Sequence, residues 1–134
     1  MHNTVGAVAV DEQGDVTAVT STGGVFLKLL GRVGDTSLPG AGTYATQFGG
    51  ASLTGLGESM VRTLITKTAC DSMRMGLDAQ GAASSAVNML SNMLATEAGI
   101  IVIDNQGGIG LAQNTPHMAH AWFKQGMDKP IAGL

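Results

Sequence analysis

TVGAVAVDEQGDVTAVTST, which spans residues 4–22, is the stretch of sequence that decides the fold. Its two arms, 5–10 and 16–20, are rich in residues that favour β-strands, and a polar connection that contains glycine separates them. Apolar β-formers on either side of a short polar connection are typical of a β-hairpin. The sequence therefore predicts two antiparallel strands at the start of the chain.

Two hydroxyl side chains meet at the open end of this hairpin. If the turn is centred on Gln13, Thr4 lies opposite Thr22, with Cβ atoms roughly 5 Å apart. If the turn shifts by one residue, Ser21 lies there instead. Thr–Thr pairs are common in sheets that have no catalytic role. A threonine at the start of a strand, beside a second hydroxyl, is also what an N-terminal nucleophile needs, so both interpretations stay open from these residues alone.

The composition indicates one domain that a partner covers. A length of 134 residues suits a single domain, or one subunit of a larger one. Although 44% of the residues are apolar, only 13% are charged, about half of the roughly 25% found in typical proteins. So little charge gives too little polar covering for a small free-standing domain. We therefore expect part of the surface to be buried against another chain.

Charge and hydropathy argue against two kinds of partner. The net charge is −3, the pI is about 5.4 and the basic residues are scattered, which argues against a nucleic-acid-binding face. No apolar run approaches the roughly 18 residues that a membrane span needs. The sequence as it begins has no signal-peptide pattern either, so we expect a cytoplasmic protein.

The sulfur and imidazole side chains give no sign of a metal site. Cys70 is the only cysteine, which rules out an internal disulfide, and the helical pattern around it predicts a buried, unreactive thiol. His117 and His120 have no carboxylate at a spacing typical of metal ligands. We therefore expect the chemistry of this chain to need no metal.

Two charged residues stand together in GRVGD, residues 31–35. Arg32 and Asp35 can form a surface ion pair, which would contribute under about 1 kcal/mol to stability. They can also clamp a zwitterion, because Arg32 can bind a carboxylate through two hydrogen bonds while Asp35 binds an ammonium group.

A second glycine-containing turn, TGLGE at residues 54–58, precedes a helical pattern. Backbone N–H groups at a helix start favour negative charge, so such a turn can hold an oxyanion. The motif is weak by itself, because glycine turns before helices are common and mostly structural.

The rest of the chain predicts strands, then helices, then strands again. The expected strands are 42–46, 51–53, 100–103 and 109–113, and the expected helices are 57–75 and 79–95. Residues 114–134 show no regular period. This order is typical of an α+β fold in which helices cover one face of an antiparallel sheet.

Six motifs follow one another along the chain: TVGAVAVD, TSTGG, GRVGD, GAGTYA, TGLGE and NTPHMAHAW. In this order they resemble the β subunit of the plant-type asparaginase/isoaspartyl peptidase family, which belongs to the N-terminal-nucleophile (Ntn) hydrolases. The resemblance implies a four-layer αββα sandwich, of which this chain is the C-terminal half with two main helices. It also implies a precursor that cuts itself before the nucleophile, and an (αβ)2 assembly. Residues 1–134 would be a single domain, with 1–3 left from the precursor and 4–134 forming the β subunit.

The same resemblance assigns catalytic roles. Thr4 would be the nucleophile that attacks the side-chain amide of asparagine or a β-aspartyl carbonyl. Its freed α-amino group would be the base, because α-amines titrate near neutral pH, at about 7.7–8.0. Thr22 would hydrogen-bond near the Thr4 hydroxyl. Thr54, through its hydroxyl, and Gly55, through its N–H, would form the oxyanion hole.

Substrate binding and self-cleavage follow from the resemblance as well. Arg32 and Asp35 would hold the α-carboxylate and α-ammonium of a small aspartyl substrate, while Gly55 and Gly57 line its binding site. The structural sodium that the family often holds would lie in the α subunit, outside this sequence. Self-cleavage would occur between Asn3 and Thr4. Because Asn3 stands where glycine or aspartate is expected, we expect this neutral residue to slow the cleavage.

Three alternative functions stay open. Glycosylasparaginase is a close relative that acts on a glycosylated asparagine. A taspase-like threonine endopeptidase would need a pocket for a longer peptide, which the intact GRVGD motif does not favour. An unprocessed, non-catalytic subunit would result if residues 1–3 stayed attached, because the nitrogen of Thr4 would then be an amide and not a base.

Overall fold

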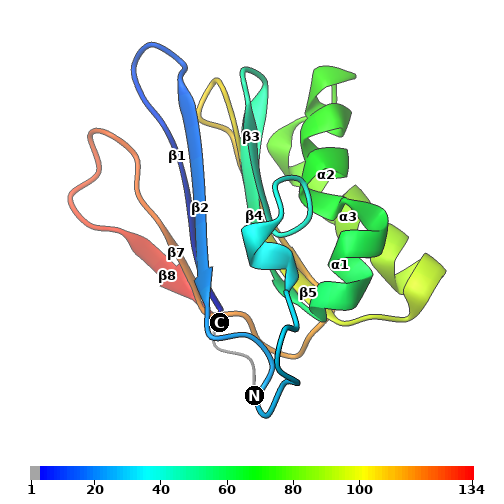
Figure 1. The fold of residues 1–134 in the computed structure, drawn as a ribbon. Helices are drawn as coiled ribbons and strands as arrows, with labels where there is room; N and C mark the ends of the chain where they lie inside the picture. Colours follow the sequence, from blue (N-terminus) through cyan, green and yellow to red (C-terminus); the bar gives the residue numbers. More distant parts are fainter. Residues whose placement is uncertain (1–3) are drawn as a thin grey trace.

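The computed structural model describes residues 4–134 and shows the expected α+β architecture. Its elements are β1 (Thr4–Val10), β2 (Val16–Thr22), the 3-10 helix η1 (Asp35–Ser37), β3 (Thr43–Thr46), β4 (Gly49–Gly55), α1 (Gly57–Thr63), α2 (Ile65–Arg74), α3 (Ala79–Leu94), β5 (Ala98–Asp104), β6 (Ile109–Gln113), β7 (His120–Trp122) and β8 (Ile131–Gly133). The helices cover one face of the antiparallel sheet β3-β4-β5-β6 (Figure 1). Within 4–134, no helix combines the length and the apolar character that a membrane crossing requires.

The first hairpin has the register that the turn at Gln13 predicts. Thr4 pairs with Thr22, and Gly6 pairs with Thr20. The shifted register is wrong, because Ser21 pairs with Val5. The two hydroxyl side chains therefore stand directly opposite each other at the open end of the hairpin.

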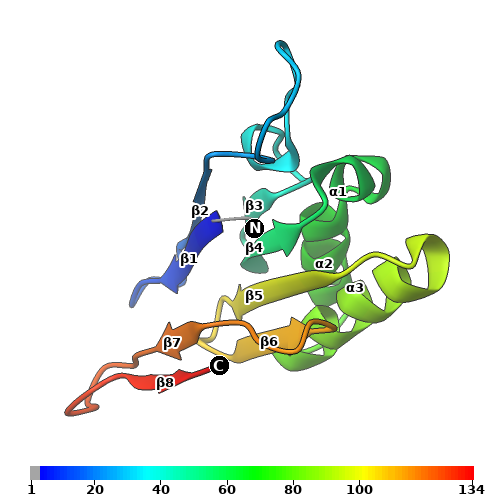
Figure 2. The same ribbon diagram turned by 90° about the horizontal axis from the view of Figure 1, so that it is seen from below.

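The β1–β2 hairpin lies on the face of the sheet that the helices leave uncovered, and the β7–β8 hairpin extends from the same side (Figures 1 and 2). The chain thus supplies a helix layer, a four-stranded sheet and part of a second β layer of the expected sandwich. Outward-facing apolar side chains remain on this second layer: Val5 is 73% exposed and Val19 is 56% exposed. These exposed side chains support a covering partner chain, which stays a prediction.

The hydrophobic core fills the space between the helices and the sheet. Ile65, Leu90, Ile100 and Val102 are among its fully buried side chains. Cys70 belongs to the same core and is 1% exposed. Burial raises the pKa of its thiol to about 12, so the thiol stays protonated at neutral pH. The prediction that Cys70 is buried is confirmed, and the raised pKa agrees with the prediction of an unreactive thiol.

The single helix expected over 57–75 is divided into α1 and α2. Leu64 separates them with a left-handed backbone, at φ 45° and ψ 49°. The β-branched residues Thr63 and Ile65 flank this position and lower the helix propensity there. The break leaves the first N–H groups of α2 without partners inside a helix, and the carbonyl of Gly40 accepts the Lys67 N–H at 3.0 Å. A loop that comes before β3 therefore caps a helix that comes after β4.

The tail 114–134 contains a short hairpin that the sequence analysis did not predict. β7 and β8 pair over only three positions, from His120 opposite Gly133 to Trp122 opposite Ile131. Strands this short contain too few residues to show an alternating pattern. Their pairing depends on the intervening loop, in which Gly126 has a φ of 85°.

Gly6 lets the hairpin approach the sheet closely, and we expect Gly6→Ala to destabilise the protein. A Cβ at Gly6 would collide with the side chain of Ser52 on β4, lying 2.9 Å from its Cβ. We expect a loss of roughly 1–3 kcal/mol, which is typical of overpacking, measurable by thermal unfolding. Gly23→Ala is the matched control, because no atom lies within 4 Å of its added methyl. Equal stability of the two variants would contradict the close approach.

Candidate active site

Thr4 and Thr22 form a hydrogen-bonded hydroxyl pair at the end of the hairpin. Thr4 Oγ1 donates to Thr22 Oγ1 at 3.2 Å, and both residues are half-buried. Thr22 Oγ1 also accepts the Gly24 N–H at 3.1 Å, which fixes the Thr22 side chain in place. The pair is therefore oriented by the backbone that follows β2.

A cluster of hydroxyl groups joins the open end of the hairpin to the sheet. Thr20 Oγ1 lies 2.6 Å from Ser52 Oγ on β4 and accepts a hydrogen bond from Thr43 Oγ1 on β3. The sequence analysis gave these residues no role. A signal was available, because Thr20 precedes Thr22 by two positions and so points to the same face of the strand. The cluster holds the strand ends that carry Thr4 and Thr22 against β4.

The TGLGE motif lies at a strand-to-helix turn beside Thr4. β4 ends at Gly55 and α1 begins at Gly57. Thr4, Thr54 and Gly55 line one cavity, which we call the Thr4 cavity, together with Thr96 and other residues. A Cβ at Gly55 would lie 2.8 Å from the backbone oxygen of Glu97, so the turn needs glycine there. The turn can present a hydroxyl and a backbone N–H toward an oxygen atom near Thr4.

Arg32 and Asp35 do not form the ion pair that the sequence allowed. Arg32 instead pairs with Glu58, with Nε 2.8 Å from Oε1 and Nη2 3.1 Å from Oε2. Arg32 and Asp35 nevertheless flank the same glycine. A Cβ at Gly57 would lie 2.9 Å from Arg32 Nη2 and 2.8 Å from Asp35 Oδ1. The cation and the carboxylate are therefore close enough to hold two ends of one small zwitterion.

Thr22 and Arg32 line a second cavity, which we call the clamp cavity. Its other walls include Gly24 and Lys28. Lys28, which the sequence analysis did not single out, donates from Nζ to the Gly23 carbonyl at 2.7 Å. Because Thr4 lines one cavity and Thr22 the other, the hydroxyl pair lies between the candidate oxyanion site and the clamp.

Asp35 is a buried carboxylate, and its burial raises its pKa. The backbone N–H of Asp35 and the positive charge of Arg32 act in the opposite direction. The side chain is enclosed by glycines, because a Cβ at Gly42 would lie 2.7 Å from Asp35 Oδ2. Keeping a charge here costs folding free energy, as is common for residues at functional sites.

We expect Asp35→Asn to stabilise the fold and to weaken substrate binding. Because the folded-state pKa of Asp35 is raised, its ionisation costs no stability below the unfolded pKa of about 3.9. The cost grows as the pH rises above that value and is complete above the folded-state pKa. The unfolding midpoint of the variant should therefore exceed that of the unchanged protein at pH 7, with the difference vanishing near pH 3. Losing the charged hydrogen bond between the Asp35 carboxylate and the ammonium group of an aspartyl substrate should raise KM by about 10- to 100-fold. An unchanged KM would contradict the clamp role, and no gain at pH 7 would contradict the cost of burial.

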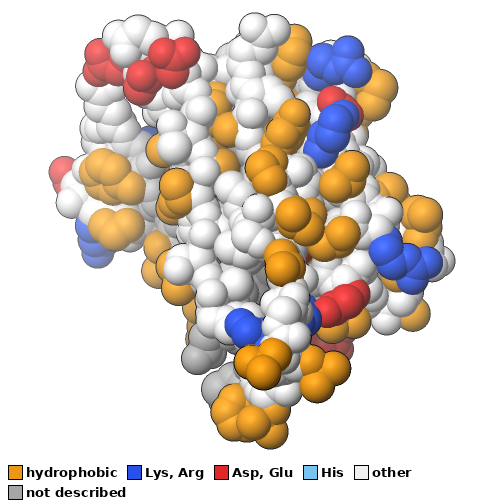
Figure 3. Space-filling model, viewed as in Figure 1, with side chains coloured by type: hydrophobic (Ala, Val, Ile, Leu, Met, Phe, Trp, Pro, Cys, Tyr) orange, Lys and Arg blue, Asp and Glu red, His pale blue; other side chains and the backbone are white. Residues whose placement is uncertain are grey.

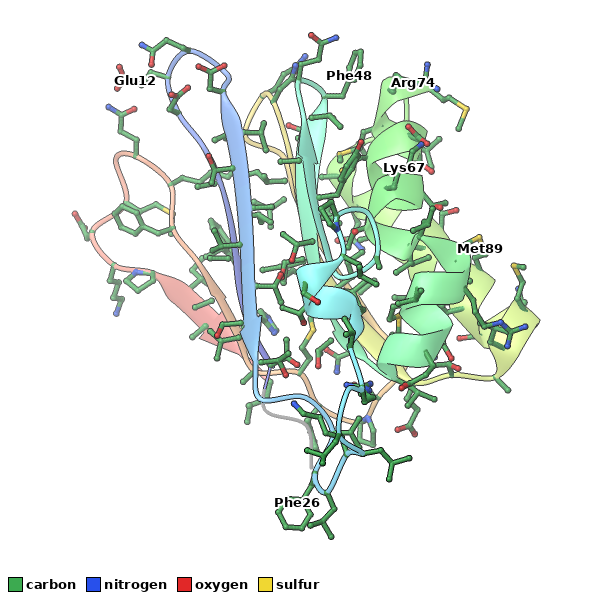
Figure 4. All side chains as sticks on the ribbon, in the orientation of Figure 1. Glu12, Phe26, Phe48, Lys67, Arg74 and Met89 are labelled. Carbon is green, nitrogen blue, oxygen red and sulfur yellow. The ribbon has the colours of Figure 1, made fainter. Side chains whose placement is uncertain are left out.

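The loop between β2 and η1 carries exposed apolar side chains next to the clamp cavity. Phe26 is 79% exposed, Leu29 is 84% exposed and Leu30 is fully exposed. Figure 3 shows hydrophobic side chains gathered at this tip, where Figure 4 labels Phe26. Exposed apolar patches of this kind are typical of interaction surfaces.

The remaining sequence expectations concern His120, a metal site and Asn3. His120 Nδ1 lies 2.8 Å from the carbonyl oxygen of Met118, so its ring is engaged by the backbone. Among residues 4–134, no group of three or more His, Cys, Asp or Glu could hold a metal ion. Asn3, the residue before the expected cleavage site, lies outside the described residues.

Comparison with known proteins gives one consistent family. Residues 1–132 match the model of a family described as Asparaginase. A plant-type L-asparaginase of Pyrococcus abyssi is 50% identical over the whole chain, which spans 44% of that protein. An isoaspartyl peptidase of Salmonella typhimurium is 41% identical over 98% of the chain and 42% of its own length. An isoaspartyl peptidase/L-asparaginase of Xenopus laevis is 36% identical over 90% of the chain and 40% of its own length. The chain thus spans less than half the length of these relatives.

Proposed function

The chain belongs to the asparaginase family, and we propose that it is the nucleophile-bearing part of an Ntn hydrolase. The proposed reaction is hydrolysis of the side-chain amide of L-asparagine and of β-aspartyl peptides. The observation that carries the proposal is the 3.2 Å hydrogen bond between Thr4 and Thr22, located between the Thr4 cavity and the clamp cavity. The names of the relatives support the same two substrates.

In the proposed mechanism, Thr4 Oγ1 attacks the side-chain carbonyl carbon of the substrate. Its proton passes to the α-amine of Thr4, freed by cleavage after Asn3, and then to the departing ammonia or amine. The Thr54 hydroxyl and the Gly55 N–H stabilise the oxyanion that forms. Water then hydrolyses the aspartyl ester on Thr4, releasing aspartate and restoring the hydroxyl. Thr22 orients the Thr4 hydroxyl throughout.

The substrate is held by its α-carboxylate and α-ammonium in this proposal. Arg32 takes the carboxylate and Asp35 takes the ammonium group, and the absence of a side chain at Gly57 lets both of these groups approach the same point. A clamp for both charged groups suits a free aspartyl residue, which favours these substrates over a longer peptide cut by an endopeptidase. The remaining part of the protein would be an α subunit from the same precursor, in a cytoplasmic (αβ)2 assembly.

The deciding experiment determines the mass and the N-terminal residue of this chain in the full-length, purified protein. A chain that begins at Thr4 and copurifies with a second polypeptide, together with release of aspartate from asparagine and a β-aspartyl dipeptide, supports the proposal. Hydrolysis of a glycosylated asparagine alone would instead identify a glycosylasparaginase. A chain that keeps residues 1–3, without activity, would identify a non-catalytic subunit.

A further inference from the structure

We propose that Glu58 is a positioning residue for Arg32: it holds the guanidinium by one edge, so that the other edge faces the substrate carboxylate. The inference rests on the proposed function, because it assigns the second edge to a substrate. It extends the clamp from two residues to three. Glu58 itself touches Arg32 and is not placed against the substrate.

The first edge of the guanidinium is fixed by two parallel hydrogen bonds. Arg32 Nε donates to Glu58 Oε1 at 2.8 Å, and Nη2 donates to Oε2 at 3.1 Å. A bidentate pair restricts both the direction and the plane of the guanidinium, which a single contact would not do. Arg32 is 16% exposed at its side chain, whereas Glu58 is 55% exposed. The acid therefore holds the arginine from the solvent side.

The second edge of the guanidinium lies among glycines. A Cβ at Gly34 would be 2.8 Å from Arg32 Nη1, and a Cβ at Gly24 would be 3.3 Å from the same nitrogen. Arg32 and both glycines line the clamp cavity. Within residues 4–134, Nη1 takes part in no hydrogen bond. Nη1 and Nη2 can therefore receive a carboxylate end-on while Glu58 keeps its own contact.

Glu58 also connects the clamp to the candidate oxyanion turn. It is the second residue of α1, and it follows Gly55 by three positions in the same strand-to-helix turn. One short segment therefore carries both the Gly55 N–H and the carboxylate that holds Arg32. The distance between the oxyanion site and the clamp is therefore set by one local structure.

The Arg32–Glu58 ion pair is better suited to orienting the guanidinium than to stabilising the fold. Ion pairs with a solvent-exposed member contribute little to folding, because water screens them. The hydrogen bonds that Arg32 donates to the Glu58 carboxylate raise the pKa of Arg32, so the cation is retained. In the opposite role, the Glu58 carboxylate would compete with the substrate for Arg32. The two roles predict opposite changes in KM.

The test compares Glu58→Ala and Glu58→Gln in the processed full-length protein, with L-asparagine as substrate. If Glu58 positions Arg32, the alanine variant must order the arginine during binding, which should raise KM roughly five- to tenfold with kcat within about threefold. Glutamine can still accept one hydrogen bond and should recover most of the loss. Asp71→Asn is the matched control, because it removes the Lys67–Asp71 pair on α2 (Lys67 is labelled in Figure 4). Its KM should stay unchanged.

An unchanged or lower KM for Glu58→Ala would overturn the inference while leaving the proposed function in place. If the unchanged protein hydrolyses neither asparagine nor a β-aspartyl dipeptide, the proposed function fails. A crystal structure of Glu58→Ala then decides the positioning role by itself. Several Arg32 conformers, or a displaced one, support positioning, whereas a single conformer identical to that of the unchanged protein overturns it.

Discussion

Replacing Thr4 with alanine is expected to lower kcat for asparagine by at least about 10⁴-fold, because the attacking oxygen is lost. The neighbouring hydroxyl of Thr22, on β2, is held in its own place by the N–H of Gly24, which follows that strand. The measurement is aspartate release under saturating substrate. Because the substitution leaves the proposed clamp of Arg32 and Asp35 untouched, the variant should still bind aspartate.

Loss of activity in Thr4→Ala has two sources that need separate controls. The same hydroxyl is expected to drive self-cleavage, so the variant should be produced with its β chain already beginning at residue 4. Thr4→Ser retains a hydroxyl and should keep measurable hydrolysis. Full hydrolysis of a β-aspartyl dipeptide by Thr4→Ala would show that the mechanism is wrong.

The parts of the fold that follow from local patterns could be predicted from the sequence. The β1–β2 register followed from the turn at Gln13, and α3 begins at Ala79 as its periodicity indicates. The break at Leu64 could not be predicted, because it depends on Gly40 capping α2 from a distant loop. The three-residue pairing of β7 with β8 was equally out of reach, since so few positions show no period.

The candidate site also has features that could be predicted from the sequence and others that could not. The contact of Thr4 with Thr22 followed from strand pairing, and TGLGE lies at the expected strand-to-helix turn. The partner of Arg32 did not follow, because Glu58 lies 26 residues away and the sequence offered the nearer Asp35. Charge and spacing suggested a local pair, but the tertiary structure supplied a better-placed acid. The catalytic roles of these residues stay predictions.

Replacing Thr54 with valine is expected to lower kcat by about 100- to 1000-fold while changing KM little. Valine has nearly the shape of threonine and suits a strand, so β4 should keep its pairing, in which Thr54 lies opposite Gly99. The hydroxyl is available as a donor, because no hydrogen bond within residues 4–134 engages it. Steady-state kinetics with asparagine would measure both constants.

The separation of kcat from KM identifies what the Thr54 hydroxyl does. An oxyanion exists only after Thr4 has attacked, so a donor aimed at it stabilises the transition state and not the bound substrate. Thr54→Ser should recover most of kcat, since it restores the donor without the methyl group. A rise in KM with kcat unchanged would instead show that Thr54 binds the ground-state substrate, and the oxyanion hole would then have to be built around Gly55 and a donor outside this chain.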